Sequence, residues 1–500
     1  MDGEADAPAA IEKRPADGEA LSNAQPFDFH MASDDPRVTG LARFIYDNYI
    51  FEPNAPNFYA LQGTLVCVLL NLYSAYLNDS TRYVRYSREP GRYTKSRYNS
   101  LPVTWAKLDR TIAALTGDII EHHIGIPGFD GFDDGRQSRM RATPLLVKWM
   151  IRFLEFTPSV IQITGEETII RRGKKDADGK AKDLPYLDTK HTKEMRKNLQ
   201  TINSLLDKTW IDLYLTDAEF VALNQRLSKD KENPVDFRRK RLRRIFNNGD
   251  FKQGGRFYHG WWQEIPSEYR RFIHIGGKQT TEIDFTGMHF SIFYSEIGGT
   301  PPDDPYDLPG LDSTERGIVK KALNALINAN TEQEAIKAIQ RESQTKPLPK
   351  AYPKAKRLVD ALKKKHAPIA HLFGTGAGLR AQFLDSQVAE RVMLKLAKED
   401  IPALPVHDSF IVQTQHAERL EAAMHEAFNE VTGGACKLKA EKQPPGIPAE
   451  DAETKKAYER SGKDPCKGYH SRMLQAIFGI AGLKKPKASP TKRRKLTKST

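Results

Sequence analysis

Two aspartates in this sequence stand where carboxylates can do chemistry. Asp408 lies within LPVHDSFIV (404–412), and Asp284, 124 residues earlier, ends the β-prone segment TTEIDF (280–285). Two carboxylates on neighbouring strands can hold two divalent cations about 3.5–4 Å apart, which activate an attacking oxygen and stabilise a leaving one. Magnesium (Mg2+) is the expected ion, with Mn2+ as a substitute, because carboxylate and phosphate oxygens are its preferred ligands. For Asp408 alone, a polar turn at the end of a strand is the simpler explanation.

A helical segment between these aspartates carries a row of cationic and amide side chains. In the segment 313–330, four such residues are spaced by four, which places them on one helical face. That face can meet an extended triphosphate, since arginine binds phosphate through two parallel hydrogen bonds and lysine supplies a compact charge. The spacing alone is typical of a solvent-exposed helix, but between two acidic strands it indicates nucleotide binding. The four residues are Arg316, Lys320, Asn324 and Asn328.

Five segments, taken in order, resemble the motifs of one enzyme family. This is the right-hand polymerase family of family A DNA polymerases and phage-type or mitochondrial single-subunit RNA polymerases. The resemblance covers about residues 236–436. GGRFY from Gly254 is similar to the element that grips the template–product duplex, DFTGMH from Asp284 to motif A, RGIVKKALNALINA from Arg316 to motif B, FLDSQVAERVM from Phe383 to the helix before motif C, and VHDSF from Val406 to motif C.

The resemblance implies a role for each residue at a matching position. Asp284 and Asp408 would bind both metal ions, helped by the main-chain carbonyl of Phe285. Arg316 and Lys320 would hold the triphosphate, with Lys320 as the proton donor to pyrophosphate. The reaction implied is template-directed nucleotidyl transfer from nucleoside triphosphates.

The same resemblance places three residues on the nucleic acid. His407 would lie near the primer terminus, and Arg256 and Gln387 would contact the template or product. A helix over 190–210 would occupy the place of the thumb. The short spacings from Asp284 to Lys320 and onward to Asp408 imply reduced fingers. No acidic exonuclease motif precedes the palm, so proofreading is not expected.

Three positions that sense the sugar in this family differ here. His289 stands where DNA polymerases have a glutamate, Asn328 where both branches have a tyrosine, and Asp385 where the RNA branch has a histidine. The bulk of His289 slightly favours deoxynucleotides. DNA synthesis is therefore the first expectation, and a single-subunit DNA-directed RNA polymerase is the alternative.

The N-terminal part predicts a second, DNA-docking domain. Apolar residues at helical spacing predict a helix over 105–115, and strands are expected within 118–126 and 136–143. Helix, strand, loop and basic strand is the order of a winged helix-turn-helix. A small α+β packing domain is the alternative. The residues expected to face outward from the helix are Lys107, Arg110 and Thr111, and the cations expected on duplex phosphates are Lys107, Arg110, Arg139 and Arg141.

A dense basic run suggests another nucleic-acid surface. Residues 238–244 contain six cations, and aromatic residues follow at Phe257, Tyr258, Trp261 and Trp262. Cations interleaved with aromatic rings are typical of surfaces that track a phosphate backbone and stack bases. The segment is therefore predicted to contact nucleic acid.

The whole-chain composition fits these expectations. The 500 residues carry a net charge of +13 with a pI near 9.3, which favours a polyanionic partner. Three cysteines without a C-x-x-C pair suit a reducing compartment. The most apolar run, about 13 residues from Leu65, is too short to span a bilayer, and no secretory signal is evident. A cytoplasmic protein without a membrane partner is expected, and phage or plasmid origin is compatible.

The fold class expected is α+β. An antiparallel polymerase palm sheet with helices would follow a winged-helix-like domain, between disordered termini. A non-catalytic DNA-binding replication initiator is the alternative of another class, and a metal nuclease would need more clustered acids. The expected boundaries are 1–33 disordered, 36–165 winged-helix-like, 166–235 connector and thumb-like helix, 236–436 palm and fingers, and 437–500 linker and basic tail.

Overall fold

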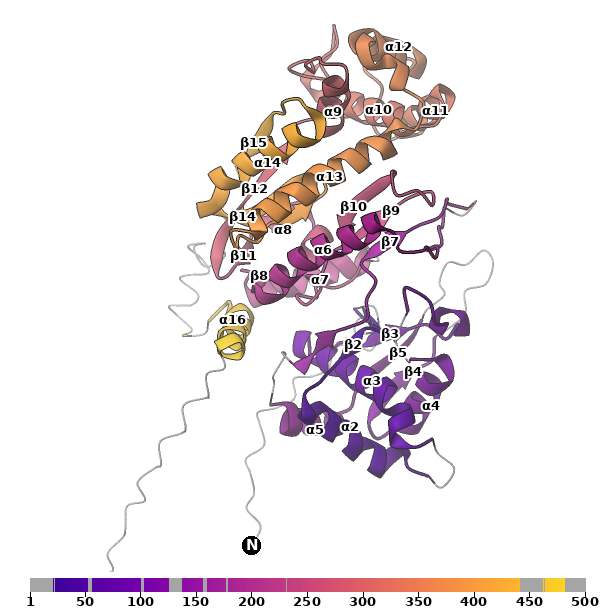
Figure 1. Ribbon diagram of the computed structural model, residues 1–500, viewed down its shortest axis with the longest axis vertical. Coiled ribbons are helices and arrows are strands. Elements are labelled where there is room, and N and C mark those ends of the chain that lie inside the picture. Colours follow the sequence, from indigo (N-terminus) through magenta and orange to yellow (C-terminus); the bar gives the residue numbers. More distant parts are fainter. Residues whose placement is uncertain are drawn as a thin grey trace, which may run out of the picture.

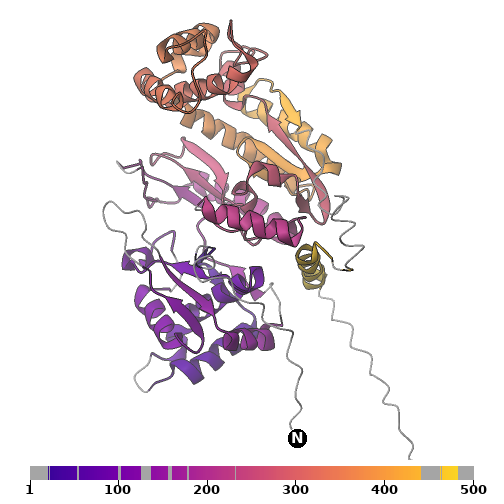
Figure 2. The same cartoon turned by 180° about the vertical axis from the view of Figure 1, so that it is seen from behind.

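The chain folds into two units, each around its own hydrophobic core. The computed structural model confirms an α+β protein with mainly antiparallel sheets. Figure 1 shows the N-terminal unit, coloured indigo to purple, below the larger second unit, and Figure 2 shows the same two lobes from behind. The structure describes residues 21, 23–52, 56–99, 103–125, 137–155, 160–176, 179–230, 232–440, 462 and 464–481.

The N-terminal unit places helices around a four-stranded sheet of order β1-β3-β5-β4. Strand β1 runs parallel to β3, the other pairs are antiparallel, and β2 pairs with β6 in a small second sheet. Its elements are β1 (Gln25–Pro26), β2 (Met31–Ala32), α2 (Pro36–Ile45), η1 (Tyr46–Ile50), α3 (Phe58–Asn78), β3 (Val84–Tyr86), η2 (Pro90–Tyr93), α4 (Trp105–Leu115), β4 (Ile120–His123), β5 (Ser138–Ala142), α5 (Pro144–Leu154) and β6 (Gln162–Ile163).

Helix α3 is the core helix of this unit. It is the one helix of the described residues that is long and apolar enough to cross a bilayer, at 21 residues, yet 72% of its most apolar window is buried inside the protein. It packs against α2, α4 and β5. The helix is longer than the apolar run in the sequence indicates, and its apolar side chains face protein.

The expected disorder of residues 1–33 is wrong for the part that the structure describes. Phe27 and Met31 are buried in the N-terminal core, and β1 hydrogen-bonds to β3. Two-residue strands are too short to show a periodic pattern, so the composition of this segment concealed them. Residues 1–20 and 22 lie outside the described residues.

The second unit is built on a six-stranded antiparallel sheet. The order is β13-β14-β12-β11-β8, and β15 pairs with the end of β12. Helices α13 and α14 lie side by side, and α14 also contacts β12 and β14 (Figure 1). A smaller sheet of order β10-β9-β7 lies beside α13. The strands are β7 (Ile169–Arg171), β8 (Ile211–Leu213), β9 (Arg243–Phe246), β10 (Gly254–Tyr258), β11 (Ile273–Ile275), β12 (Lys278–Phe285), β13 (Leu404–Val406), β14 (Ser409–Gln413) and β15 (Leu438–Ala440).

The helices of this unit include one long helical stretch, α9 to α13, between the strands β12 and β13. Their apolar sides share one core with the sheet. They are α6 (Lys190–Lys208), α7 (Asp217–Lys229), η4 (Trp261–Gln263), α8 (Ser267–Arg270), α9 (Met288–Glu296), η5 (Ser313–Glu315), α10 (Arg316–Asn328), α11 (Glu332–Glu342), α12 (Ala355–Lys365), η6 (Ala367–Leu372), α13 (Ala377–Ala397), η7 (Thr414–His416), α14 (Ala417–Thr432) and α16 (Lys467–Ala481).

The segment expected to be a connector belongs to the second unit. Ile169, Leu199 and Val235 lie in the same buried cluster as Ile283 and Phe410 of the large sheet. The two cores therefore separate between about residues 160 and 169, and not at 235. The predicted helix over 190–210 is confirmed as α6, which packs on α13.

The segment expected to be a linker and tail also contributes structure. Strand β15 extends the large sheet at the end of β12, and α16 docks at the opposite edge. Arg472 of α16 binds the buried Asp212 carboxylate through two hydrogen bonds of 2.8 Å, and the Tyr469 ring packs on Tyr214. Residues 441–461, 463 and 482–500 lie outside the described residues.

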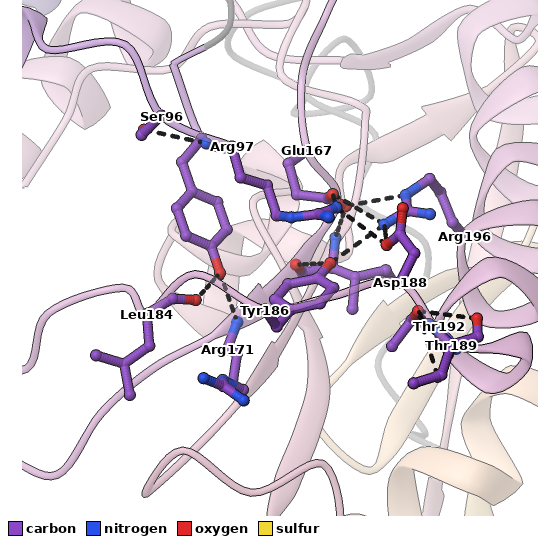
Figure 3. Close-up of polar contacts among 12 residues, drawn as sticks. Ser96, Arg97, Glu167, Arg171, Leu184, Tyr186, Asp188, Thr189, Thr192 and Arg196 are labelled. Atoms are coloured by element: carbon purple, nitrogen blue, oxygen red, sulfur yellow. Dashed lines mark hydrogen bonds and ion pairs between the residues drawn. The ribbon is translucent and has the colours of Figure 1, made fainter.

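An ion-pair cluster joins the two units. Glu167, between them in sequence, accepts hydrogen bonds from Arg97 of the N-terminal unit at 2.8 Å and from Arg196 of α6 at 2.9 Å (Figure 3). The Arg97 guanidinium also lies 4.2 Å from the centre of the Tyr186 ring. Because one buried carboxylate is shared by both arginines, the cluster ties the orientation of one unit to the other.

The basic run of residues 238–244 has structural contacts that the sequence did not indicate, and its contact with nucleic acid stays a prediction. Phe257, Trp261 and Trp262 are buried core residues. The cations of the run are engaged by acids or by main-chain carbonyls, and every one of these acids except Asp236 is distant in sequence. The pairs are Arg238 with Asp236, Arg239 with Glu264, Arg241 with Asp207, Arg243 with Glu166 and Arg244 with Glu390, and Lys240 donates to the carbonyls of Asp207 and Thr209.

Arg244 generates a stability prediction. Its guanidinium is fully buried and donates to Glu390, Ser386 and the carbonyl of Gly255 at 2.9–3.0 Å. The variant Arg244→Met should lower the free energy of unfolding by about 3–5 kcal/mol, because it leaves a buried carboxylate without its counter-charge. Urea denaturation measures this change.

A double variant and an exposed pair serve as controls. Adding Glu390→Gln to Arg244→Met removes the orphaned charge and should restore part of the loss. Arg172→Met breaks the exposed pair with Asp183 and should cost less than about 1 kcal/mol. Equal losses for Arg172→Met and Arg244→Met would show that Arg244 is not a core contact.

Candidate active site

The two aspartates meet where the central strands of the large sheet end. Strands β12 and β14 pair antiparallel with Asp284 opposite Ser409, and Asp408 is the second residue of the turn between β13 and β14. The Phe285 amide donates to the Asp408 carbonyl at 3.2 Å. The apolar residues around Asp408 therefore belong to two strands of one hairpin, and His407, with φ of +57°, turns the chain between them.

The oxygen atoms at this point suit a hard divalent cation. Asp284 and Asp408 are partly exposed, and the Asp408 carboxylate accepts no hydrogen bond and forms no ion pair among the described residues. The N–H and C=O of one strand residue point to the same side, so the Phe285 carbonyl faces the Asp408 strand. Two carboxylates and a carbonyl leave positions for water and phosphate oxygens, as magnesium sites commonly do. No group of three or more His, Cys, Asp or Glu side chains that could hold a metal ion gathers in the described segments, so the site would rest on two carboxylates and a carbonyl.

A third carboxylate, missed in the sequence, supports this geometry. Glu282 lies two residues before Asp284 and hence on the same face of β12. It is buried, accepts a hydrogen bond from Arg270 at 2.9 Å and accepts a short one from the Ser409 hydroxyl. These bonds fix β12 to the hairpin that carries Asp408. In TTEIDF the two acids are separated by one apolar residue, and this strand alternation could have identified Glu282 as a same-face neighbour of Asp284.

Arg256, Asp385 and His289 form a compact cluster beside Asp408. Arg256 Nε donates to Asp385 Oδ2 at 2.6 Å, and its Nη2 donates to His289 Nε2 at 3.2 Å. The three residues come from β10, α13 and α9. Strand β10 can approach α13 because Gly255, at a φ of +81°, has no side chain: a Cβ there would lie 3.0 Å from Ser386 Oγ of α13 and 2.6 Å from the Phe246 ring of β9. Arg256, predicted to bind the nucleic acid, is held by two protein side chains, and its contact with nucleic acid stays a prediction.

The cluster has an unusual charge distribution. Burial raises the pKa of Asp385 to about 7, with the Arg256 charge opposing the shift and the Asp408 charge adding to it. Burial lowers the pKa of His289 to about 4, and Arg256 shifts it in the same direction, so the imidazole is neutral near pH 7. Arg256 also lies within electrostatic reach of Asp408. Its positive charge therefore offsets part of the negative charge at the aspartate pair.

Helix α10 presents the predicted polar face. Its opposite face, with Ile318 and Leu323, is buried in the core. Lys320 is exposed and has no side-chain partner among the described residues, whereas Arg316 is engaged by Asp304. All four predicted side chains, Arg316, Lys320, Asn324 and Asn328, are exposed, and the Asn328 side chain donates to the Asn324 carbonyl at 2.8 Å.

Tyr306 packs against Arg316 of α10, and sequence reasoning missed it. Its ring is nearly buried and lies under the Arg316 guanidinium, 4.7 Å from the ring centre. Burial raises the pKa of Tyr306, and the charges of Asp408 and Asp284 contribute in the same direction. The hydroxyl is thus within electrostatic reach of both aspartates. The loop DDPYDLPG has no periodicity that would single out this tyrosine.

Two further predicted contacts lie near the site. His407 is exposed in the turn next to Asp408. Gln387 is on α13, one turn from Glu390 and two residues from Asp385. Its Nε2 is buried and finds no hydrogen-bond partner in the described part of the chain.

The four cations predicted to bind DNA in the N-terminal unit lie in different environments. Arg110 is exposed on α4 and Lys107 is partly exposed. Arg139 Nε donates to the Leu21 carbonyl at 2.6 Å. Arg141 is buried, pairs with Glu121 at 2.7 Å and lies 4.3 Å from the centre of the Tyr83 ring, so its prediction as a phosphate contact is wrong.

One further expectation for α4 fails. Thr111 was expected to face outward, but its side chain is buried. Its hydroxyl donates to the Lys107 carbonyl at 2.8 Å, which satisfies the polar group within the helix. The outward cationic face of α4 is therefore narrower than the sequence indicated.

The structure brings together Asp284, Asp408, His289, Arg256 and Asp385, and Tyr306 lies against Arg316 of α10. The predicted contacts of the N-terminal unit belong to a different lobe (Figure 1). No protein-family model matches the sequence, and a search of the curated proteins finds no match. The function therefore has to be inferred from the geometry of the site.

Proposed function

We propose that this chain is a template-directed nucleotidyltransferase that extends a nucleic-acid strand, with deoxynucleotides favoured. The observation that carries the proposal is the register of β12 and β14, which sets Asp284 beside the turn that holds Asp408. Helix α10 adds a cationic face whose Arg316 lies over the Tyr306 ring, and the charges of both aspartates contribute to the raised pKa of Tyr306. Paired carboxylates and a phosphate-binding face are the two parts that metal-assisted phosphoryl transfer needs.

Each side chain has a distinct part in the proposed reaction. Asp284, Asp408 and the Phe285 carbonyl would hold two Mg2+ ions, which when bound stabilise charge on the attacking and leaving oxygens. Arg316 would bind the triphosphate by two parallel hydrogen bonds. Lys320, exposed and unpaired in the described structure, would place a proton donor at the leaving pyrophosphate. His407 would lie beside the primer terminus.

The architecture around the site supports a polymerase palm. An antiparallel sheet with two acid-bearing strands and helices on its side is what the resemblance to right-hand polymerases implies. Helices α10, α11 and α12 would act as reduced fingers, and α6 would stand in the place of the thumb. A non-catalytic replication initiator is the alternative, but it gives no reason for the aspartate pair or for a Lys320 that is exposed and unpaired in the described structure.

For the N-terminal unit we propose a winged-helix DNA-docking role. The chain runs α3, β3, η2, α4, β4, β5, and the three strands lie in the order β3-β5-β4. In such a fold α4 would enter the major groove, with Arg110 and Lys107 as its cations. The segment between β4 and β5, where a wing would stand, lies largely outside the described residues.

The aspartates give the first test of the proposal. Asp284→Asn and Asp408→Asn should each reduce nucleotide incorporation in a primer-extension assay by several orders of magnitude, because a neutral amide cannot hold the metal charge. Binding of the primer–template duplex should change little. Asp400→Asn alters an exposed aspartate of positive φ and should leave incorporation unchanged. Extension at the wild-type rate by the Asp408→Asn protein would refute the assignment.

The sugar preference gives the second test. The His289 ring is held by Arg256, whereas Asn328 bonds within its own helix. The bulk of the imidazole would therefore stand in a fixed place beside the incoming sugar. The wild-type protein should accept both sugars with deoxynucleotides favoured, and His289→Gly should raise ribonucleotide use. His289→Gln keeps an acceptor for Arg256 and should change the preference less. Strict confinement of the wild type to ribonucleotides would favour the RNA-polymerase alternative.

Helix α4 gives the third test. Arg110→Ala should weaken duplex binding by the full-length protein and lower the slope of log affinity against log salt by about one, as expected for one lost phosphate contact. Lys148→Ala, an exposed cation on α5 of the same unit, is the control and should have little effect. If the salt dependence of binding is unchanged in Arg110→Ala, the proposed DNA-docking role of α4 is contradicted and a packing role for the unit is favoured.

A further inference from the structure

The loop between α9 and α10 places a carboxylate on the arginine that is proposed to bind phosphate. Arg316 Nε donates to Asp304 Oδ2 at 3.0 Å, and Arg316 Nη2 donates to Asp304 Oδ1 at 3.2 Å. Two parallel bonds from one guanidinium edge are the same arrangement that arginine uses for phosphate. In this structure the Arg316 fork is therefore occupied by a side chain of the protein.

Asp304 is held independently of Arg316. Its Oδ1 also accepts the Tyr306 amide at 2.8 Å. The next residue, Pro305, is fixed because its carbonyl accepts a hydrogen bond from Nε2 of the buried His366 at 2.9 Å. The Tyr306 ring in turn lies beneath the Arg316 guanidinium. The carboxylate thus keeps its place when the arginine moves to another anion.

The pair is open enough to be exchanged. The side chains of Arg316 and Asp304 are 52% and 40% exposed, so water and a ligand can reach the fork. Exposed ion pairs contribute little net free energy, and a polyphosphate offers more negative charge and more acceptor oxygens than one carboxylate. A phosphate chain bound at α10 can therefore replace Asp304 on Arg316.

We propose that Asp304 is an internal competitor for the phosphates of the incoming nucleotide. It occupies Arg316 in the empty enzyme, is displaced when a triphosphate binds, and so lowers the affinity for polyphosphate groups. This inference rests on the proposed function for the identity of its ligand. The opposite role, in which Asp304 orients Arg316 for phosphate, predicts that loss of the carboxylate weakens binding.

Calorimetric titration with inorganic tripolyphosphate in the presence of Mg2+ tests the proposal on the full-length protein. Asp304→Asn should bind tripolyphosphate tighter by on the order of tenfold, because it removes both a like charge near the phosphates and the internal partner of Arg316. Asp303→Asn is the matched control. It removes an adjacent carboxylate that pairs with Lys437 instead, and should change the affinity less than about twofold.

A third variant assigns the effect to Arg316. The tighter tripolyphosphate binding of Asp304→Asn should disappear when Arg316→Gln is added, because there is then no guanidinium for which the carboxylate and the phosphates compete. Weaker binding by Asp304→Asn, or an equal gain in Asp303→Asn, would overturn the proposal. Thermal unfolding of each variant verifies that the fold is retained.

Primer extension separates this inference from the proposed function. With both correct, Asp304→Asn lowers the KM for nucleotide relative to the wild type. Tighter tripolyphosphate binding without any incorporation by the wild type would contradict the polymerase function and leave the competition intact. Normal incorporation with an unchanged or raised KM in Asp304→Asn would contradict the competition alone.

Discussion

The backbone ladder between β12 and β14 is the constraint on which the site depends. It sets Asp284 opposite Ser409 and so beside the turn at Asp408. A slip of one residue would turn every β12 side chain to the other face and separate the carboxylates. Three features hold this register: the buried residues on both faces of β14, the hydrogen bond from the Ser409 hydroxyl to Glu282, and the hydrogen bond from the Phe285 N–H to the Asp408 carbonyl. The packing of the sheet therefore determines the chemistry of its edge.

Electrostatic balance is the second requirement, because like charges gathered in one place repel. Two carboxylates beside the aspartate pair each have an arginine: Glu282 has Arg270, and Asp385 has Arg256. These pairs offset negative charge that would otherwise add to that of Asp284 and Asp408. The pair can then be brought together at the end of the strands and still attract cations.

The parts of the site that carry local patterns could be predicted from the sequence. The strand ends at Asp284 and Asp408 and the polar face of α10 follow from strand alternation and helical spacing, and the structure places them as expected. Partners distant in sequence could not be predicted. Arg244 and Glu390 lie 146 residues apart, and only the folded chain shows that the basic run pairs with acids of the protein. Tyr306, α16 and the strand at 25–26 could not be predicted for the same reason, because the role of each depends on a tertiary contact.

The most direct test of the central claim is to locate the metal ions. Crystals of the protein with a primer–template, a non-hydrolysable nucleotide and Mn2+ would give anomalous diffraction at the manganese edge. The account predicts two peaks about 3.5–4 Å apart between the Asp284 and Asp408 carboxylates, with the Phe285 carbonyl in the coordination shell. Well-ordered nucleotide without manganese at these two aspartates would contradict it.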